Sequence, residues 1–116
     1  MTDKLPNAST AYVDENRIKF YLLNPDHPKG GSKEKFFSNR GFSREYWQIM
    51  GTALLNQGAS NLVTSVKATE WGTRYQVDCH CQTPDNSNPC VRTVWQIDKG
   101  DTRPRLLTAH PLVNVN

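Results

Sequence analysis

The spacing of hydrophobic residues changes once along the chain, at Gly58, and this change restricts the folds that the chain can adopt. Before Gly58, apolar residues recur every three or four positions, as on a helix with one buried face. After Gly58 they alternate with polar residues, which is typical of a strand that has one face against a core. Because the two kinds of element are separated along the chain rather than interleaved, the pattern predicts an α+β fold.

Two or three helices are expected before Gly58, over residues 15–24, 33–39 and 43–57. Asp14 and Ser32 are suitable N-caps for the first two, because their side-chain oxygens can accept hydrogen bonds from the first backbone N–H groups. Pro25 ends the first helix, since proline disfavours the helical conformation at the residue before it. Gly41 fits the end of the second helix, and Gly58 is expected to end the third.

Four strands are expected after Gly58, over residues 62–69, 74–82, 90–98 and 105–110. The connections between them are short and rich in turn-forming residues. Parallel pairing would need crossovers of about a dozen residues or more, so the strands should form an antiparallel meander. Helices packed on one face of this four-stranded sheet would leave its other face open. Residues 4–12, before the first helix, are expected to form an arm or an edge strand.

Alternation along the strands sorts the side chains between the two faces of the sheet. Val77, Trp95, Leu107 and Ala109 are expected to face the helices. The open face is then expected to carry a polar, mostly basic set: Lys67, Arg74, Gln76, Asp78, His80, Arg92, Gln96, Leu106, Thr108 and His110.

The histidines, arginine and hydroxyl in this set are the groups that metal-free RNA cleavage requires. Attack by the ribose 2′-hydroxyl needs a base to remove its proton and an acid to protonate the leaving oxygen, and histidine suits both roles near neutral pH. Arginine supplies fixed positive charge in a planar fork that matches phosphate oxygens. A simpler interpretation stays open, because an antiparallel sheet with one face in water carries polar and basic residues anyway.

Length and charge agree with a small nucleic-acid-binding protein without requiring one. The 116 residues suffice for a single domain, residues 1–116, with an ordered core over about 5–111. The net charge of +3 gives a mild preference for polyanions. No stretch approaches the roughly 20 apolar residues of a transmembrane helix, and the first residues do not resemble a signal peptide. A cytoplasmic protein without a membrane partner is therefore expected.

The three cysteines, Cys79, Cys81 and Cys90, cannot form a fully paired disulfide framework, and reduced thiols are expected. Their spacing also permits a zinc interpretation, but structural zinc sites need four ligands and no second ligand pair accompanies them. Cys79 and Cys81 are therefore expected to be buried core thiols, with neither metal nor cofactor. The loop from His27 to Ser32 leads into a helix N-terminus that could bind phosphate, but it lacks the Walker spacing.

Several motifs resemble those of a bacterial domain family of unknown function. The motifs are FYLLNPDHPKGGSKEKFF at residues 20–37, GF at 41–42, TPD at 83–85, VRTVWQI at 91–97 and PRLLTAHP at 104–111. The resemblance extends from about Leu5 to Pro111, and the family occurs as small stand-alone proteins and as C-terminal domains in polymorphic-toxin and phage-associated settings. The order of helices and strands also resembles the barnase–EndoU–colicin–RelE (BECR) group of metal-independent RNases.

The second resemblance implies catalytic residues on the open sheet face and on a helix or loop beside it. Arg92 would bind the scissile phosphate, Lys33 would add positive charge and Thr108 would orient the phosphate. His27 would be general acid or base. His110 would be the second proton carrier, although the family tends to have tyrosine at that position. Further RNA contacts are expected from Lys29, Lys67, Arg74 and His80.

Three functional hypotheses follow. The first is an RNase toxin that leaves a 2′,3′-cyclic phosphate, is controlled by a cognate antitoxin or immunity protein, and acts in the cytoplasm or after delivery to a target cell's cytoplasm. The second is a non-catalytic module of a toxin–antitoxin or phage-linked system that binds nucleic acid or protein. The third is another toxin chemistry, such as nucleotidyl or ADP-ribosyl transfer, for which the sequence offers no acidic pair or nucleotide loop. The sequence leaves open whether the domain is catalytic.

Overall fold

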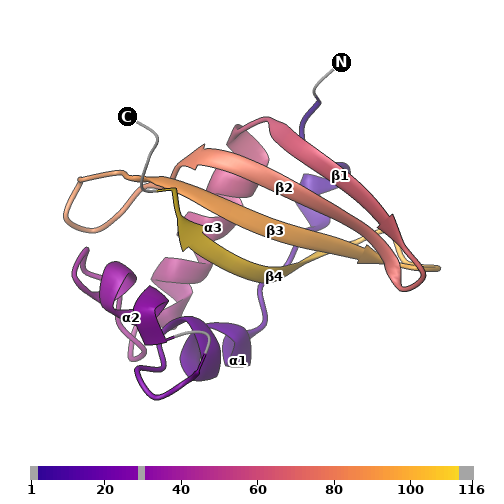
Figure 1. Cartoon of the computed structure of the whole chain (residues 1–116). Coiled ribbons are helices and arrows are strands. Elements are labelled where there is room, and N and C mark those ends of the chain that lie inside the picture. Colours follow the sequence, from indigo (N-terminus) through magenta and orange to yellow (C-terminus); the bar gives the residue numbers. More distant parts are fainter. Residues whose placement is uncertain (1–2, 29–30, 113–116) are drawn as a thin grey trace.

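A four-stranded antiparallel sheet with helices packed against it makes up the structure (Figure 1). The computed structural model describes residues 3–28 and 31–112. Strand order follows the chain, from β1 (Val63–Thr69) through β2 (Gly72–His80) and β3 (Cys90–Asp98) to β4 (Pro104–Pro111). The predicted α+β meander is confirmed.

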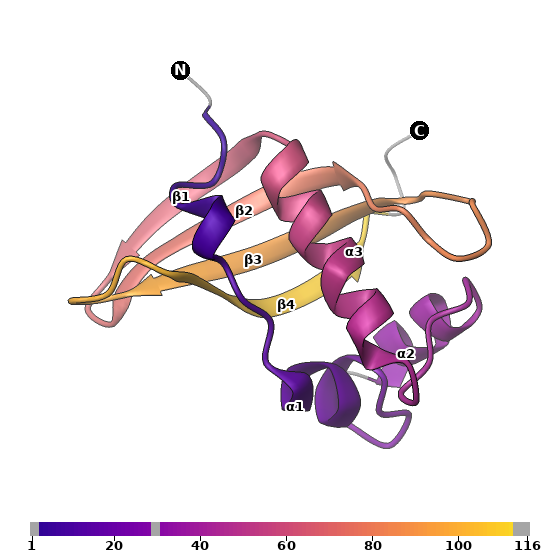
Figure 2. The same ribbon diagram turned by 180° about the vertical axis from the view of Figure 1, so that it is seen from behind.

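The helices all precede the strands in the sequence. A short 3-10 turn, η1 (Ala8–Thr10), is followed by α1 (Glu15–Arg17), which continues into the π-helical η2 (Ile18–Leu22), and then by α2 (Gly31–Ser38) and α3 (Trp47–Ser60). Asp14 caps α1 as predicted, because its carboxylate accepts from the Asn16 N–H at 2.9 Å. Helix α3 lies across one face of the sheet, whereas α1 and α2 lie beside β4 (Figure 2). In the described part of the chain, no helix has the length and apolar character needed to span a membrane.

The residues before α1 form an arm that bonds to both edge strands of the sheet (Figure 2). At its start, the backbone C=O of Asp3 accepts from the Val63 N–H at 2.8 Å, at the beginning of β1. Further along, the Tyr12 N–H donates to the Pro104 C=O at 3.0 Å and the Tyr12 C=O accepts from the Leu106 N–H at 3.1 Å, both on β4. These contacts are isolated bridges, so the segment is the predicted arm and not a fifth strand.

A buried polar network fixes α3 on the sheet. The side-chain amide of Gln57, which is 2% exposed, donates to the C=O groups of Val77 at 2.9 Å and Val91 at 2.8 Å. Its oxygen accepts from the Thr93 hydroxyl at 2.6 Å, and that hydroxyl oxygen accepts from the Trp95 indole N–H at 2.7 Å. A buried amide without partners would cost about 1–3 kcal/mol. The network therefore favours one placement of the helix over β2 and β3.

Gly58 lies inside α3 and does not end it, contrary to the prediction, since the helix continues to Ser60. A Cβ atom at this position would lie 2.7 Å from Cζ2 of Trp95, whose side chain is fully buried. The indole ring occupies the space that any other side chain would need. Gly58 is thus explained by the close approach of helix and sheet, and not by a helix terminus.

We expect Gly58→Ala to lower the free energy of unfolding by about 1–3 kcal/mol, because overpacking against a buried ring outweighs the helix propensity of alanine. Gly51→Ala is the matched control in the same helix, since its Cβ would meet Ile18 Cδ1 at 3.6 Å, an ordinary contact. The control should be neutral or stabilising by up to about 1 kcal/mol. Urea unfolding of both variants measures the difference, and equal midpoints would contradict the packing explanation.

A bulge in β4 changes which of its side chains face the helices. Val94 pairs with Thr108 but Trp95 pairs with Leu106, so Leu107 is an extra residue on β4. Leu106 is therefore buried beside Trp95 at 2% exposure, whereas the prediction placed it on the open face. Leu107, predicted for the core, is only half-buried. Regular alternation misses this, because a bulge shifts the faces by one residue.

Gln96 is a second departure from the predicted exposure. Its register partner on β2 is Arg74, so it faces away from α3 as expected, yet it is only 3% exposed. Arg74 Nε donates to Gln96 Oε1 at 3.0 Å, and Gln96 Nε2 donates to Asp98 Oδ1 at 2.6 Å. Long neighbouring side chains therefore cover Gln96.

The prediction of reduced thiols is wrong for two of the three cysteines. Cys79 and Cys90 form a disulfide between β2 and β3, with Cα atoms 4.3 Å apart. The register of the two strands pairs Cys79 with Val91 and His80 with Cys90, so the two cysteines occupy adjacent positions that only the strand pairing reveals. Joined to each other, they are not zinc ligands. Cys81 is a free and fully buried thiol, and burial raises its pKa to about 11.

Thiol titration tests this arrangement. The oxidised native protein should show no reactive thiol at neutral pH, because Cys81 is both inaccessible and protonated. Denaturation without reductant should expose one thiol per chain, and reduction under denaturing conditions should expose all three. A chromogenic thiol reagent gives the counts. Three thiols before reduction would show that the disulfide does not form.

Candidate active site on the outer sheet face

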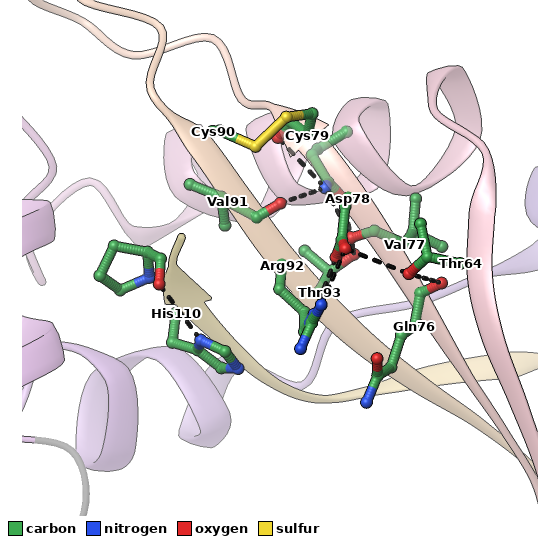
Figure 3. A network of polar contacts seen from close by, with 12 residues as sticks. Thr64, Gln76, Val77, Asp78, Cys79, Cys90, Val91, Arg92, Thr93 and His110 are labelled. Atoms are coloured by element: carbon green, nitrogen blue, oxygen red, sulfur yellow. Dashed lines mark hydrogen bonds and ion pairs between the residues drawn. A yellow bond between two sulfur atoms is a disulfide. The ribbon is translucent and has the colours of Figure 1, made fainter. Parts of the chain in front are cut away.

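A row of polar side chains crosses all four strands on the outer face, which is the sheet face turned away from α3 (Figure 3). Asp78 of β2 lies opposite Arg92 of β3, and Arg92 lies opposite His110 of β4. Arg92 donates to the two carboxylate oxygens of Asp78, from Nε at 2.9 Å and from Nη2 at 3.0 Å. Thr64 of β1 donates to the same carboxylate at 3.1 Å. The row therefore holds the guanidinium between a carboxylate and an imidazole.

The ion pair in this row is partly shielded from water, with side-chain exposures of 14% for Asp78 and 31% for Arg92. Burial by itself would raise the pKa of Asp78, but the hydrogen bonds from Arg92 and Thr64 and the charge of Arg92 outweigh it and hold the pKa below its ordinary value. The hydrogen bond to Asp78 raises the pKa of Arg92. Because the pair uses Nε and Nη2, the Nη1 side of the fork is turned away from Asp78 (Figure 3).

We expect Asp78→Asn to lower the free energy of unfolding by about 1.5–3 kcal/mol at neutral pH, because a charge-assisted hydrogen-bond pair is lost. A carboxyl whose folded-state pKa is depressed stabilises the fold above its unfolded-state pKa of about 3.9 and loses that contribution as pH falls through the folded-state pKa. The difference from the wild type should therefore shrink below about pH 4. Denaturant unfolding across pH 3–7 measures it, and a constant difference would rule out the ion pair as its source.

A second cluster lies where β4 meets the N-terminal helices. The hydroxyl of Thr108, on β4, is 2.9 Å from the phenolic oxygen of Tyr21, in η2. Lys33, in α2, donates from Nζ to Tyr21 Oη at 2.5 Å and to Thr108 Oγ1 at 3.3 Å. Three segments that are distant in the sequence thus place one ammonium group and two hydroxyl groups in mutual contact.

The two clusters adjoin along β4. Thr108 and His110 are two residues apart on one strand, so their side chains leave the same face with Cα atoms roughly 7 Å apart. The residues of the two clusters therefore lie on one face, from α2 across β4 to β3. Together, Tyr21, Lys33, Arg92, Thr108 and His110 form the candidate site.

Sequence reasoning does not identify Tyr21, because it lies within an apolar run that predicts a core role. Its ring is indeed packed against the core, but its oxygen is not. Lys33 Nζ lies 4.7 Å and the Arg17 guanidinium carbon 5.4 Å from the ring centroid. Burial by itself would raise the pKa of Tyr21, but the hydrogen bonds with Lys33 and Thr108 and the positive charges of Lys33 and Arg17 lower it below its ordinary value.

The structure brings four of the five predicted catalytic residues into the candidate site, namely Lys33, Arg92, Thr108 and His110. The fifth, His27, lies at its margin, where its ring meets the Tyr21 ring edge-on with centroids 4.9 Å apart. The backbone N–H of His27 also donates to the Asn24 C=O at 3.2 Å, and this hydrogen bond closes a turn in the loop after η2.

The predicted RNA-binding residues are dispersed. Lys67 and Arg74 are exposed and lie opposite each other on β1 and β2. His80 is exposed at the end of β2, and its Nδ1 lies 2.9 Å from the Asn88 C=O. Lys29 lies outside the described residues.

The chemistry of the candidate site is that of cations and proton carriers. Its neighbour Asp78 is engaged by Arg92 in a two-bond ion pair. Over residues 3–28 and 31–112, no group of three or more His, Cys, Asp or Glu side chains is arranged to hold a metal ion. The site is therefore suited to bind an anion and to move protons near it.

Comparison with known proteins places the fold and the family. A chain in the solved structure "Contact-dependent growth inhibition toxin - immunity protein complex from Klebsiella pneumoniae 342" has a similar fold, with a TM-score of 0.70 and 9% sequence identity, over 90% of this chain and 95% of that one. No curated protein sequence matches the chain. The model of one family, described as Domain of unknown function (DUF6883), matches residues 4–113. Because this match extends over nearly the whole chain, the protein belongs to the DUF6883 family.

Proposed function

We propose that this domain is a metal-independent endoribonuclease that cleaves RNA through a 2′,3′-cyclic phosphate. The observation that carries the proposal is the convergence of Arg92, His110, Thr108 and Lys33 from two strands and a helix. A guanidinium, an ammonium, an imidazole and a hydroxyl meet at the edge of an open sheet face. This set supplies anion binding and proton transfer together, which transesterification at a phosphodiester requires.

The roles follow from the position of each group. Arg92 is held rigidly by Asp78 and presents the rest of its fork to a phosphate oxygen, so it stabilises charge that develops in the transition state. Thr108 orients the phosphate by a hydrogen bond, and Lys33 adds a second positive charge. His110, beside Arg92 in the row, accepts the proton of the attacking 2′-hydroxyl. His27, at the margin, is the second histidine that could carry a proton.

A toxin context is part of the same proposal. The structural neighbour is described as part of a toxin–immunity protein complex, and at 9% identity this likeness establishes the fold alone. The description of that neighbour supports the hypothesis of a toxin domain held inactive by a cognate immunity protein or antitoxin. We further propose that the domain is of BECR type and is delivered to, or acts in, a cell's cytoplasm. The exposed Lys67, Arg74 and His80 would then contact RNA beyond the cleaved phosphate. In this proposal the whole chain forms a single domain.

Purified protein should cut total cellular RNA in the presence of EDTA, and Arg92→Ala should slow cutting by about 100-fold or more, because a transition-state contact is lost. Arg105→Ala is the matched control. Arg105 forms a similar two-bond ion pair with Asp98 and is similarly exposed, 33% against 31%, but lies toward the other end of β4. Gel analysis of the products, with circular dichroism to confirm folding, measures the effect.

Loss of cutting in EDTA, or full activity of folded Arg92→Ala, would reject the mechanism. Absence of cutting by the wild type under all conditions would favour the non-catalytic binding module, and RNA binding by the same preparation would then be the next measurement. Growth arrest with intact RNA would point to a different toxin chemistry.

A further inference from the structure

The phenolic oxygen of Tyr21 has the surroundings of a proton-transfer group. It accepts a hydrogen bond from Lys33 Nζ at 2.5 Å and shares another with the Thr108 hydroxyl at 2.9 Å. Three groups that lie against the ring can carry positive charge: Lys33 from α2, Arg17 from α1 and His27 from the following loop. Cations around a phenol stabilise the phenolate that remains after the proton has left.

We propose that Tyr21 is the general acid of the cleavage reaction and that Lys33 acts through it as a positioning residue. This inference rests on the proposed RNase function. A phenol has a proton to give, as an acid must, and the lowered pKa of Tyr21 makes it a better donor than an isolated phenol. His27 meets the Tyr21 ring edge-on at the margin of the candidate site, whereas the Tyr21 hydroxyl itself lies between Lys33 and Thr108.

The proton balance of the step is complete with residues of the site. The 2′-oxygen gives its proton to the His110 imidazole and forms a bond to phosphorus. The bond between phosphorus and the 5′-oxygen breaks, and the 5′-oxygen takes the proton of the Tyr21 hydroxyl. The products are a 2′,3′-cyclic phosphate and a 5′-hydroxyl end, and the enzyme is left with an imidazolium at His110 and a phenolate beside Lys33. Exchange of one proton with water restores both groups.

A substrate that needs no acid tests the assignment. A short RNA spanning a mapped cleavage site is compared with the same RNA in which the scissile 5′-oxygen is replaced by sulfur, because a thiolate leaves without protonation. Tyr21→Phe keeps the packed ring and removes only the oxygen. It should cut the ordinary RNA about 100- to 10,000-fold more slowly than the wild type, and the sulfur-linked RNA within about 10-fold of the wild-type rate. His110→Ala should be slow on both substrates.

Two further variants separate this role from alternatives. Tyr75→Phe, in a half-buried tyrosine that also packs on the core, is the matched control and should cut both RNAs at the wild-type rate. Lys33→Met should move the alkaline limb of the pH–rate profile to higher pH, because the phenolate loses its cation and the pKa of Tyr21 rises. A merely structural lysine would leave that limb in place.

The outcomes distinguish this inference from the proposed function. If the wild type cuts RNA and Tyr21→Phe is equally impaired on both substrates, or is not impaired, Tyr21 is not the acid although the domain is an RNase. If His27→Ala and not Tyr21→Phe recovers on the sulfur-linked RNA, the acid is His27. If the wild type cuts neither substrate, the proposed function fails and this inference fails with it.

Discussion

The contact between α3 and β3 determines the rest of the structure. Gly58 has no side chain, so the helix approaches until the Trp95 ring fills the space, and Gln57 then reaches the backbone of β2 and β3. A helix held at this distance makes its side of the sheet the core. The other side cannot be apolar, since nothing in the described chain covers it as α3 covers the first. The polar row of Asp78, Arg92 and His110 lies on this uncovered side of the sheet, opposite the closely packed helix.

Most of the fold could be predicted because it depends on short-range periodicity. The change from a helical to an alternating pattern at Gly58 predicts the element types and order, and short turns predict antiparallel pairing. The exact register of the paired strands could not be predicted. The bulge that buries Leu106 and the disulfide between Cys79 and Cys90 both depend on strand register, which alternation does not fix.

The candidate site divides in the same way. Arg92, Thr108 and His110 could be assigned to one face because they lie on strands, and the bulge falls before Thr108 in the chain, so it leaves the two β4 residues on the outer face. The role of Tyr21 could not be predicted, because a tyrosine within an apolar run is expected to be a core residue. Only the position of Lys33 Nζ beside its phenolic oxygen distinguishes it. Site residues that act through a neighbour from another segment leave no pattern of their own in a sequence.

The arm before α1 has a consequence for how the chain acquires its structure during synthesis. Asp3 bonds to Val63 and Tyr12 bonds to Pro104 and Leu106, so the arm is synthesised before its partners and finds them only after β1 and β4 have been made. Contacts of such long sequence separation close late and slow folding. Lys33 and Tyr21 likewise cannot form their hydrogen bonds with Thr108 until β4 has been synthesised. A nascent chain therefore contains Tyr21, Lys33 and Arg92 but lacks Thr108 and His110 until translation has passed β4.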